Sequence, residues 1–585
     1  MVNAPNGQVH GSATNGTSSF KVEDFPIDSA HRKMKVAMIG AGFSGIMAGI
    51  RIPQRLRNCD LTIFEKNKDV GGTWFENHYP GLCCDIPAHC YSLTFEPNPN
   101  WSKFYAPGPE ILKYLQNVSA KYNLHRFLKF RHKLVEAQWN EETSQWHLTF
   151  EVTDSNGQVT KVEDSFDFVI QGMGGLSQWD WPEIPGLQKF KGRLLHTAAY
   201  EGTEKDEQDR RVAVIGCGSS AIQVVPTVQP YAKQVDNYVR GKTWIATPFA
   251  STELSKRQPD LRNYTFTEEE KQAFAADPEA YHKWRHSLEA ELNSVHEVTQ
   301  KGSALQKMAV EAFKNIMLEK LAAKPEIAKA IIPNFAVACR RLTPGPGYLE
   351  ALVEPNVGFI TDHIAEVTEN GIVTVDGTIR EYDTIVCATG FDTSYEPRID
   401  IVGRNGTRLS DLWSDVPQHY MSLAAGPDFP NWFIVNGPNS SLGSGSLLVL
   451  FERQVDYITE VIAKMQREQL AAISAKADAI KDYMEYIANY FERTVYSEKC
   501  RSWYKAGREL GPVIGLWPGS CLHAIKALKH PRWEDFDYQQ RGQPNRFAWL
   551  GNGSAEEENG PPDSGLDRAF YLNEVDIPPV PALAK

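Results

Sequence analysis

Several features are missing from this chain of 585 residues. It has no apolar run near the ~18–20 residues of a membrane-spanning helix, no signal-peptide core and no run of basic residues. With a net charge of −12, it is a poor candidate for binding nucleic acid or an anionic membrane. The nine cysteines are scattered, without a C-x-x-C pair. We therefore expect reduced thiols, no metal site and a cytoplasmic protein.

What is present begins with a glycine-rich loop between a short apolar run and a stretch that permits a helix. Gly40, Gly42 and Gly45 form G-x-G-x-x-G, and Glu65 closes the next apolar run. This spacing is the fingerprint of a dinucleotide-binding unit, in which the glycines admit a pyrophosphate and the acid accepts hydrogen bonds from a ribose. The simpler alternative is a glycine-rich turn between two core elements.

The segment 71–115 is rich in glycine, proline and aromatic residues, and its first part has no clear period. An ordered connection of this kind is usually functional. Gly72, Thr73 and Trp74 suit contact with a large flat cofactor. Asp85 lies among apolar neighbours, where it is either a functional carboxylate or an ordinary turn residue.

A second unit repeats the opening pattern, with an apolar strand before Gly216, Gly218 and Ala221 in G-x-G-x-x-A. No acid ends its next strand. Arg240 and Lys242 stand there instead, which favours the 2′-phosphate of NADP over NAD. The alternative for Arg240 is a solvated arginine at a strand end.

Between and after these units, turn signals separate antiparallel strands over 128–170, and apolar residues at helical spacing fill about 265–332. The strand before Gly390 would return the chain to the first unit. We expect an α/β fold with two Rossmann-like domains and a helical insertion in the second. The expected division is a disordered leader (1–32), an FAD-binding domain (33–180 and 386–545), an NADP-binding domain (181–385, insertion about 265–335) and a tail (546–585).

These motifs, in this order, resemble the class I Baeyer–Villiger monooxygenases. The resemblance covers roughly 33–540 and is carried by GAGFSG, GGTWFENHYPGLCCDIP, GCGSSA, CRR, ATGFD and SWY. The sequence around residue 500 also resembles that of fungal members that act in secondary metabolism. The linker signature of the family is matched at Phe190, Gly192 and His196, whereas Tyr200 stands where tryptophan is usual.

The resemblance implies that NADPH reduces FAD, that reduced flavin and O2 give a C4a-peroxyflavin, and that this peroxide inserts oxygen into a small-molecule ketone to give an ester or lactone. It implies that Arg341 stabilises the peroxide and that Asp85 orients Arg341. Arg340 would face the NADP phosphate, and Trp503 the nicotinamide half. The remaining predicted cofactor contacts are Phe43, Ser44, Lys66, Ile86, Tyr91, Ser219, Ser220 and Gly241.

Two alternatives stay open at this point. Tyr200 resembles the sister branch of flavin-containing monooxygenases, which hydroxylate nitrogen, sulfur or activated carbon. A non-catalytic FAD-binding paralogue is the other, although the intact second glycine loop argues against it. The sequence names neither the substrate nor the oligomeric state, which is a monomer or a homodimer.

Overall fold

A five-stranded parallel sheet forms the centre of the first unit. The computed structural model describes residues 20–27, 32–542, 545–558, 561 and 565–573. The strands of this sheet, in spatial order, are β19 (Trp432–Ile434), β7 (Phe168–Gln171), β1 (Met34–Ile39), β2 (Cys59–Phe64) and β3 (Leu128–Lys129). Because β19 comes from far along the chain, segments from both halves of the described chain build one core.

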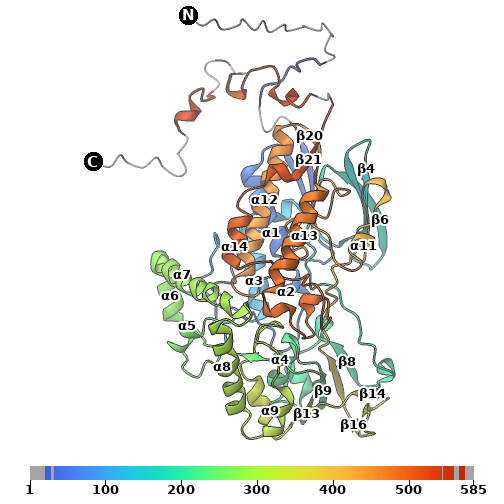
Figure 1. Cartoon of the computed structure of the whole chain (residues 1–585), viewed down its shortest axis with the longest axis vertical. Helices are drawn as coiled ribbons and strands as arrows, with labels where there is room; N and C mark the ends of the chain where they lie inside the picture. The colour runs from blue at the N-terminus through green and yellow to red at the C-terminus, as the bar shows by residue number, and fades with distance from the viewer. Residues whose placement is uncertain (1–19, 28–31, 543–544, 559–560, 562–564, 574–585) are drawn as a thin grey trace, which may run out of the picture.

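Helices cover this sheet. They are α1 (Phe43–Arg55), α3 (Gly108–Lys121), α12 (Leu447–Arg467), α13 (Ala477–Glu492) and α14 (Cys521–Ala527). Figure 1 shows them together in the upper body, where α1 lies against α12. The strand pair β20 (Leu470–Ala475) and β21 (Phe536–Gln540) adjoins them. Within the described residues, none of the helices is both long and apolar enough to cross a membrane.

A second five-stranded parallel sheet lies at the other end of the molecule (Figure 1). Its strands, in spatial order, are β13 (Val357–Ile360), β10 (Gln234–Tyr238), β9 (Arg211–Ile215), β17 (Thr384–Cys387) and β8 (Arg193–His196). The helices α4 (Ser219–Val228) and α10 (Tyr348–Val353) accompany it. Two parallel sheets of this kind confirm the expected fold class.

Smaller sheets flank the two large ones. The predicted antiparallel strands over 128–170 are present, with a further strand, β6, that the sequence analysis did not separate. This sheet contains β18 (Asp400–Val402), β4 (His132–Asn140), β5 (Gln145–Thr153) and β6 (Val159–Phe166). The others contain β11 (Ile245–Ala246) with β12 (Thr343–Pro344), and β14 (Ile364–Val367), β15 (Gly371–Thr374) and β16 (Ile379–Glu381).

The helical stretch expected over 265–332 is also confirmed. Its helices are α6 (Glu268–Ala276), α7 (Pro278–Ser294), α8 (Ala304–Lys320) and α9 (Pro325–Ile331), after the short α5 (Ser251–Ser255). Side-chain caps begin three of them: Thr267 caps α6, Asp277 caps α7 and Ser303 caps α8. Each cap accepts a hydrogen bond from a first-turn N–H that has no partner inside the helix.

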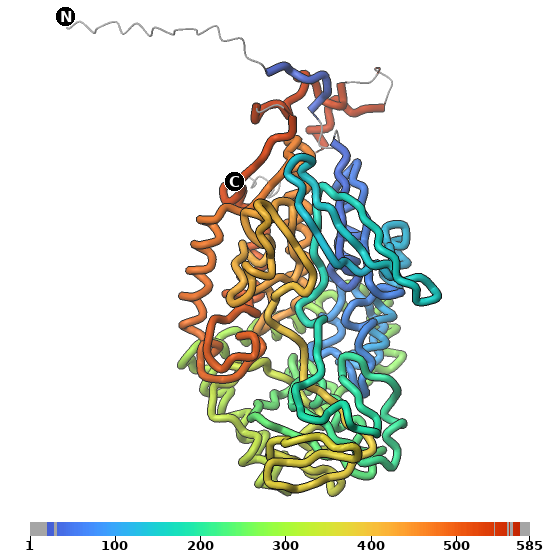
Figure 2. Tube along the Cα trace, turned by 90° about the vertical axis from the view of Figure 1, so that its right-hand side faces the viewer, coloured from blue at the N-terminus to red at the C-terminus, as the bar shows by residue number. Residues whose placement is uncertain are grey.

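The leader contradicts one expectation in part. Residues 1–19 and 28–31 lie outside the described residues, but residues 20–27 pair with the C-terminal tail. The N–H of Ile27 donates to the carbonyl of Ser554 at 2.7 Å, and that of Asn552 donates to the carbonyl of Phe25 at 2.7 Å. Figures 1 and 2 show these two segments together above the body.

Candidate active site

The first glycine loop follows β1 and leads into α1. Gly40 has φ +103°, and a Cβ there would lie 2.6 Å from the carbonyl oxygen of Gly172. A Cβ on Gly45 would lie 2.1 Å from the carbonyl oxygen of Gly40. Gly42 differs, because its Cβ would meet only backbone atoms of Gly72, the nearest of them the Cα at 3.5 Å. The loop therefore packs tightly against its own sheet. It is less crowded on the side of Gly72, where a pyrophosphate fits at the N-terminus of α1.

Glu65 at the end of β2 holds this loop in place. One carboxylate oxygen accepts from the N–H of Ala41 at 2.8 Å, and the other accepts from the N–H of Asn67 at 2.8 Å. Burial raises the pKa of this carboxyl group. Each oxygen keeps a further lone pair, so the ribose contact of Glu65 stays a prediction. The neighbouring Lys66 pairs with Glu76 at 2.6 Å, and its predicted cofactor contact stays a prediction.

An aromatic wall lies beside the glycine loop. Gly72, at φ +52°, begins the short helix α2 (Thr73–Glu76) and so turns Trp74 inward. The rings of Trp74 and Phe43 both meet Tyr91 edge to face, with centroids 5.4 Å apart in each pair. Ser44, in the first turn of α1, and Ile86 are also buried. These side chains form a mostly apolar wall of the kind against which an isoalloxazine ring packs.

Asp85 and Arg341 meet at the centre of the predicted site. A guanidinium N–H of Arg341 donates to the carboxylate of Asp85, although 256 positions separate the two residues. The pKa of Arg341 is raised, chiefly because the Asp85 carboxylate favours the charged guanidinium. The Arg341 side chain is 37% exposed, so it presents a fixed positive charge to the space before it.

The second glycine loop has the same form and a more open front. Gly216 has φ +129°, and a Cβ there would lie 2.4 Å from the carbonyl oxygen of Ala388. A Cβ on Gly218 would meet nothing within 4 Å. Ser219 and Ser220 open α4, and Ala221 is buried beneath them. The N-terminus of α4 therefore faces free space, which suits a second dinucleotide.

Basic side chains gather beside this loop at the ends of the strands. Arg240 and Lys242 are exposed just after β10. Arg340 donates to the carbonyl of Lys242 at 2.7 Å, and a Cβ on Gly241 would lie 3.8 Å from the same guanidinium. The structure thus brings together three cations that the sequence predicted from separate segments. Their arrangement suits a phosphate monoester.

Trp503 lies on the loop between α13 and α14, in a 3-10 turn over Trp503–Lys505. Its ring packs against Tyr504, with centroids 4.6 Å apart, and against Gly515. No contact of Trp503 tests its predicted place against the nicotinamide, which stays a prediction.

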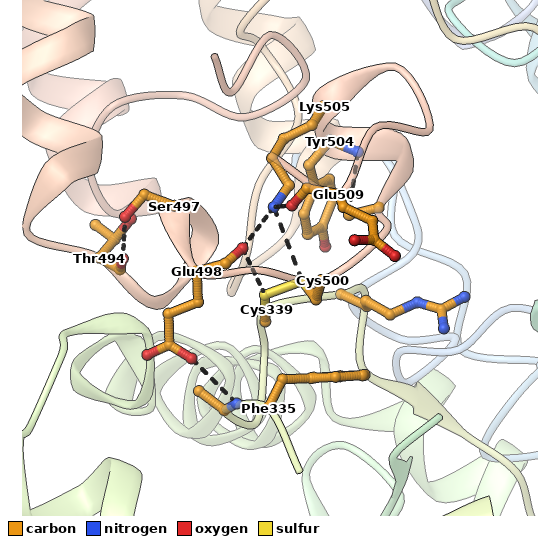
Figure 3. The surroundings of a disulfide bond; sticks show 12 residues. Phe335, Cys339, Thr494, Ser497, Glu498, Cys500, Tyr504, Lys505 and Glu509 are labelled. Carbon is orange, nitrogen blue, oxygen red and sulfur yellow. Dashed lines mark hydrogen bonds between the residues drawn. A yellow bond between two sulfur atoms is a disulfide. The ribbon is translucent and has the colours of Figure 1, made fainter. Parts of the chain in front are cut away.

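One expectation about the cysteines is wrong. Cys339 and Cys500 form a disulfide, while the other seven cysteines are free. Figure 3 shows this bond beside Lys505, a buried lysine that the sequence analysis did not single out. With 161 positions between the two cysteines, no spacing rule could pair them. The only sequence signal for this pair is that Cys339 directly precedes the predicted arginines and Cys500 shortly precedes Trp503.

This chain is similar to known flavin-dependent monooxygenases over most of its length. Residues 33–252 match the family model described as flavin-binding monooxygenase-like. The FAD-binding monooxygenase tazF of Aspergillus terreus is 39% identical over 96% of this chain and 98% of its own length. A Baeyer–Villiger monooxygenase of Pseudomonas aeruginosa is 35% identical over 87% of this chain and 92% of its own.

A solved structure shares the fold. Cyclohexanone monooxygenase from Rhodococcus sp. Phi1, bound to NADP+, superimposes with a TM-score of 0.73 at 26% identity. The match covers 87% of this chain and 99% of that one.

Proposed function

Because this chain belongs to the flavin-binding monooxygenase-like family, as a Baeyer–Villiger monooxygenase that uses FAD and NADPH, we propose that the Asp85–Arg341 pair is its catalytic centre. The observation that supports the proposal most is the pair itself. It joins the predicted flavin-facing segment to the loop that also carries Arg340.

The first glycine loop, the aromatic wall and Glu65 would hold FAD, and the second loop with Arg240, Lys242 and Arg340 would hold NADPH. When bound, these groups supply the hydride and the reduced ring that activates O2. Arg341 stabilises the negative charge that develops on oxygen, because a guanidinium stays protonated and offers several donors. The Asp85 carboxylate orients the guanidinium of Arg341.

The alternative of nitrogen or sulfur hydroxylation rested on Tyr200. That side chain is buried, and its hydroxyl donates to the carboxylate of Glu207 at 3.3 Å. Glu207 also accepts from Thr384 at 2.7 Å and pairs with Arg193. Tyr200 is therefore accounted for by packing at the edge of the second sheet, and it does not favour the alternative. We propose a ketone as the substrate class.

Arg341→Ala tests the proposal. We expect it to keep FAD and its reduction by NADPH while ester formation falls by about 10²- to 10³-fold, since one charged stabilising group is removed. Arg341→Lys keeps the charge but loses the fork that pairs with Asp85, and we expect partial activity. The measurement is rapid-mixing absorbance together with product mass spectra for a ketone and a thioether. Ester formed by Arg341→Ala at the normal rate would overturn the assignment. Sulfoxide without ester from the unaltered enzyme would overturn the substrate class.

A further inference from the structure

The disulfide joins two loops that carry predicted cofactor contacts. Cys339 directly precedes Arg340 and Arg341 in the second unit, and Cys500 stands three positions before Trp503 in the first. Both cysteines are buried, at 0% and 4% exposure. The bond therefore links the two units covalently at the edge of the candidate active site.

We propose that Cys339 and Cys500 form a thiol–disulfide exchange site, open to dithiol reductants and disulfide oxidants, whose state sets the affinity for NADP(H). The consequence for NADP(H) rests on the function proposed for the arginine loop. The exchange itself rests only on the sulfur pair and its surroundings.

Lys505 makes the surroundings of the two sulfur atoms unequal. The lysine is 1% exposed, and two of its N–H groups donate to the carbonyls of Glu498 at 2.7 Å and Glu509 at 2.8 Å. Its Nζ also lies 4.0 Å from the Sγ of Cys500 (Figure 3). A buried cation beside a sulfur stabilises the thiolate. Lys505 is thus a positioning residue for Cys500.

Cys339 has a different environment. Its Sγ lies 3.7 Å from the carbonyl oxygen of Glu498, an acceptor that favours the protonated thiol once the disulfide is reduced. In the reduced pair, Cys500 is therefore the thiolate and Cys339 the thiol. A sulfur that leaves most readily as a thiolate directs attack to the other one, so a reductant attacks Cys339.

The exchange balances as follows. A thiolate of the dithiol attacks the Sγ of Cys339, the Sγ–Sγ bond breaks, and its electron pair stays on Cys500 beside Lys505. The second thiol of the reductant then forms its own disulfide, and Cys339 leaves and takes the proton. The dithiol loses two electrons, and the protein gains two thiols. Oxidised glutathione reverses the reaction with the same balance.

Backbone hydrogen bonds hold the loop around Cys500 together. The N–H of Cys500 donates to the carbonyl of Glu509 at 3.2 Å, and that of Ser502 to the carbonyl of Arg508 at 3.2 Å. Across to the arginine loop, the N–H of Ala336 donates to the carboxylate of Glu498 at 3.2 Å. Breaking the disulfide removes the covalent part of this link. We expect the arginine loop to lose its fixed position when the disulfide is reduced.

The test uses the full-length, FAD-loaded protein, incubated with oxidised glutathione or with dithiothreitol. Alkylation after denaturation should label seven cysteines in the oxidised form and all nine in the reduced form. The Kd of NADP+, measured by equilibrium dialysis, should rise about fivefold or more on reduction. Added NADP+ should slow the reduction, because the buried sulfurs become accessible only when the loop lifts.

Variants separate the site from its neighbours. Cys500→Ser should give the weaker Kd for NADP+, and that Kd should not change with either reagent. Cys59→Ser, which changes a cysteine remote from the site, should keep the change in Kd. Lys505→Met should move the alkylation of reduced Cys500 to higher pH, a change that lost packing alone would not produce. If Cys500→Ser does not fold, the unaltered protein still decides the question.

Nine labelled cysteines after oxidation, or one Kd for both redox states, would overturn the proposal. Neither readout requires a ketone or oxygenation. A failure of this inference is therefore distinguishable from a failure of the proposed catalytic centre.

Discussion

Single residues decide which nicotinamide cofactor this site accepts. Arg240 is exposed at the strand end where a 2′-phosphate is expected, and Arg340 stands close by. A charged hydrogen bond to a phosphate is specific to NADPH, because NADH lacks that group. The choice of cofactor should therefore depend on Arg240 more than on the glycine loop.

We expect Arg240→Ala to raise the KM for NADPH by about 5- to 150-fold, which corresponds to ~1–3 kcal/mol, and to leave the KM for NADH nearly unchanged. Steady-state kinetics with both cofactors measures this. Arg211 is a matched control, because it begins β9 at the opposite end of the sheet. If Arg240→Ala weakened both cofactors equally, Arg240 would not contact the phosphate.

At the scale of elements, the two glycine loops differ in what requires a glycine without a side chain. Gly45 presses α1 against the Gly40 carbonyl, so its missing side chain is a requirement of packing. Gly218 at the start of α4 faces open space and has an ordinary φ of −83°. One loop is constrained by the protein, the other by its expected ligand.

Alanine should destabilise the fold at Gly45, whereas at Gly218 it should weaken cofactor binding with little effect on stability. We expect Gly45→Ala to lower the free energy of unfolding by about 1–3 kcal/mol or more and to reduce FAD content, because the new methyl group overlaps backbone. Gly218→Ala should change stability by no more than about 1 kcal/mol but weaken NADP+ binding. Urea unfolding and equilibrium dialysis measure the two effects. Equal destabilisation by both substitutions would contradict this distinction.

Elements also show what the sequence could reveal. The two glycine loops were predictable because each one combines a strand, a turn and a helix within a few residues. The Asp85–Arg341 pair was predictable only by resemblance, since its members lie far apart and each alone fits an ordinary turn or surface role. The disulfide and Lys505 were missed because three-dimensional proximity brings them together and no local pattern records it.

At the scale of the whole molecule, buried histidines make stability depend on pH. Burial lowers the pKa of His196 and of His419 to about 4 and lowers that of His89 as well. In the unfolded chain these groups bind protons below ~6.5, whereas the folded chain holds them neutral. Stability is therefore full above pH ~6.5 and is lost progressively as pH falls toward 4.

Urea unfolding at several pH values between 7.5 and 4.5 measures this loss. His419 alone should contribute at most about 3 kcal/mol, at ~1.4 kcal/mol per unit of pKa difference. Its Nδ1 accepts from the N–H of Ser422, and its Nε2 faces the side-chain oxygen of Asn439. His419→Asn keeps an acceptor but cannot titrate, so it should flatten the pH dependence. The exposed His530 is the control. An unchanged slope in His419→Asn would count against the assignment.

The order of strands in the first sheet has a consequence for synthesis on the ribosome. β7 ends at Gln171 and β19 begins at Trp432, so 260 residues (172–431) emerge between two neighbouring strands. At ~5–20 residues per second, the edge of β7 waits about 13–50 s for its partner. The second sheet is completed by β17 during that interval. The nascent chain thus exposes an unpaired strand edge while its other half folds, and this window is when we expect chaperones to bind it.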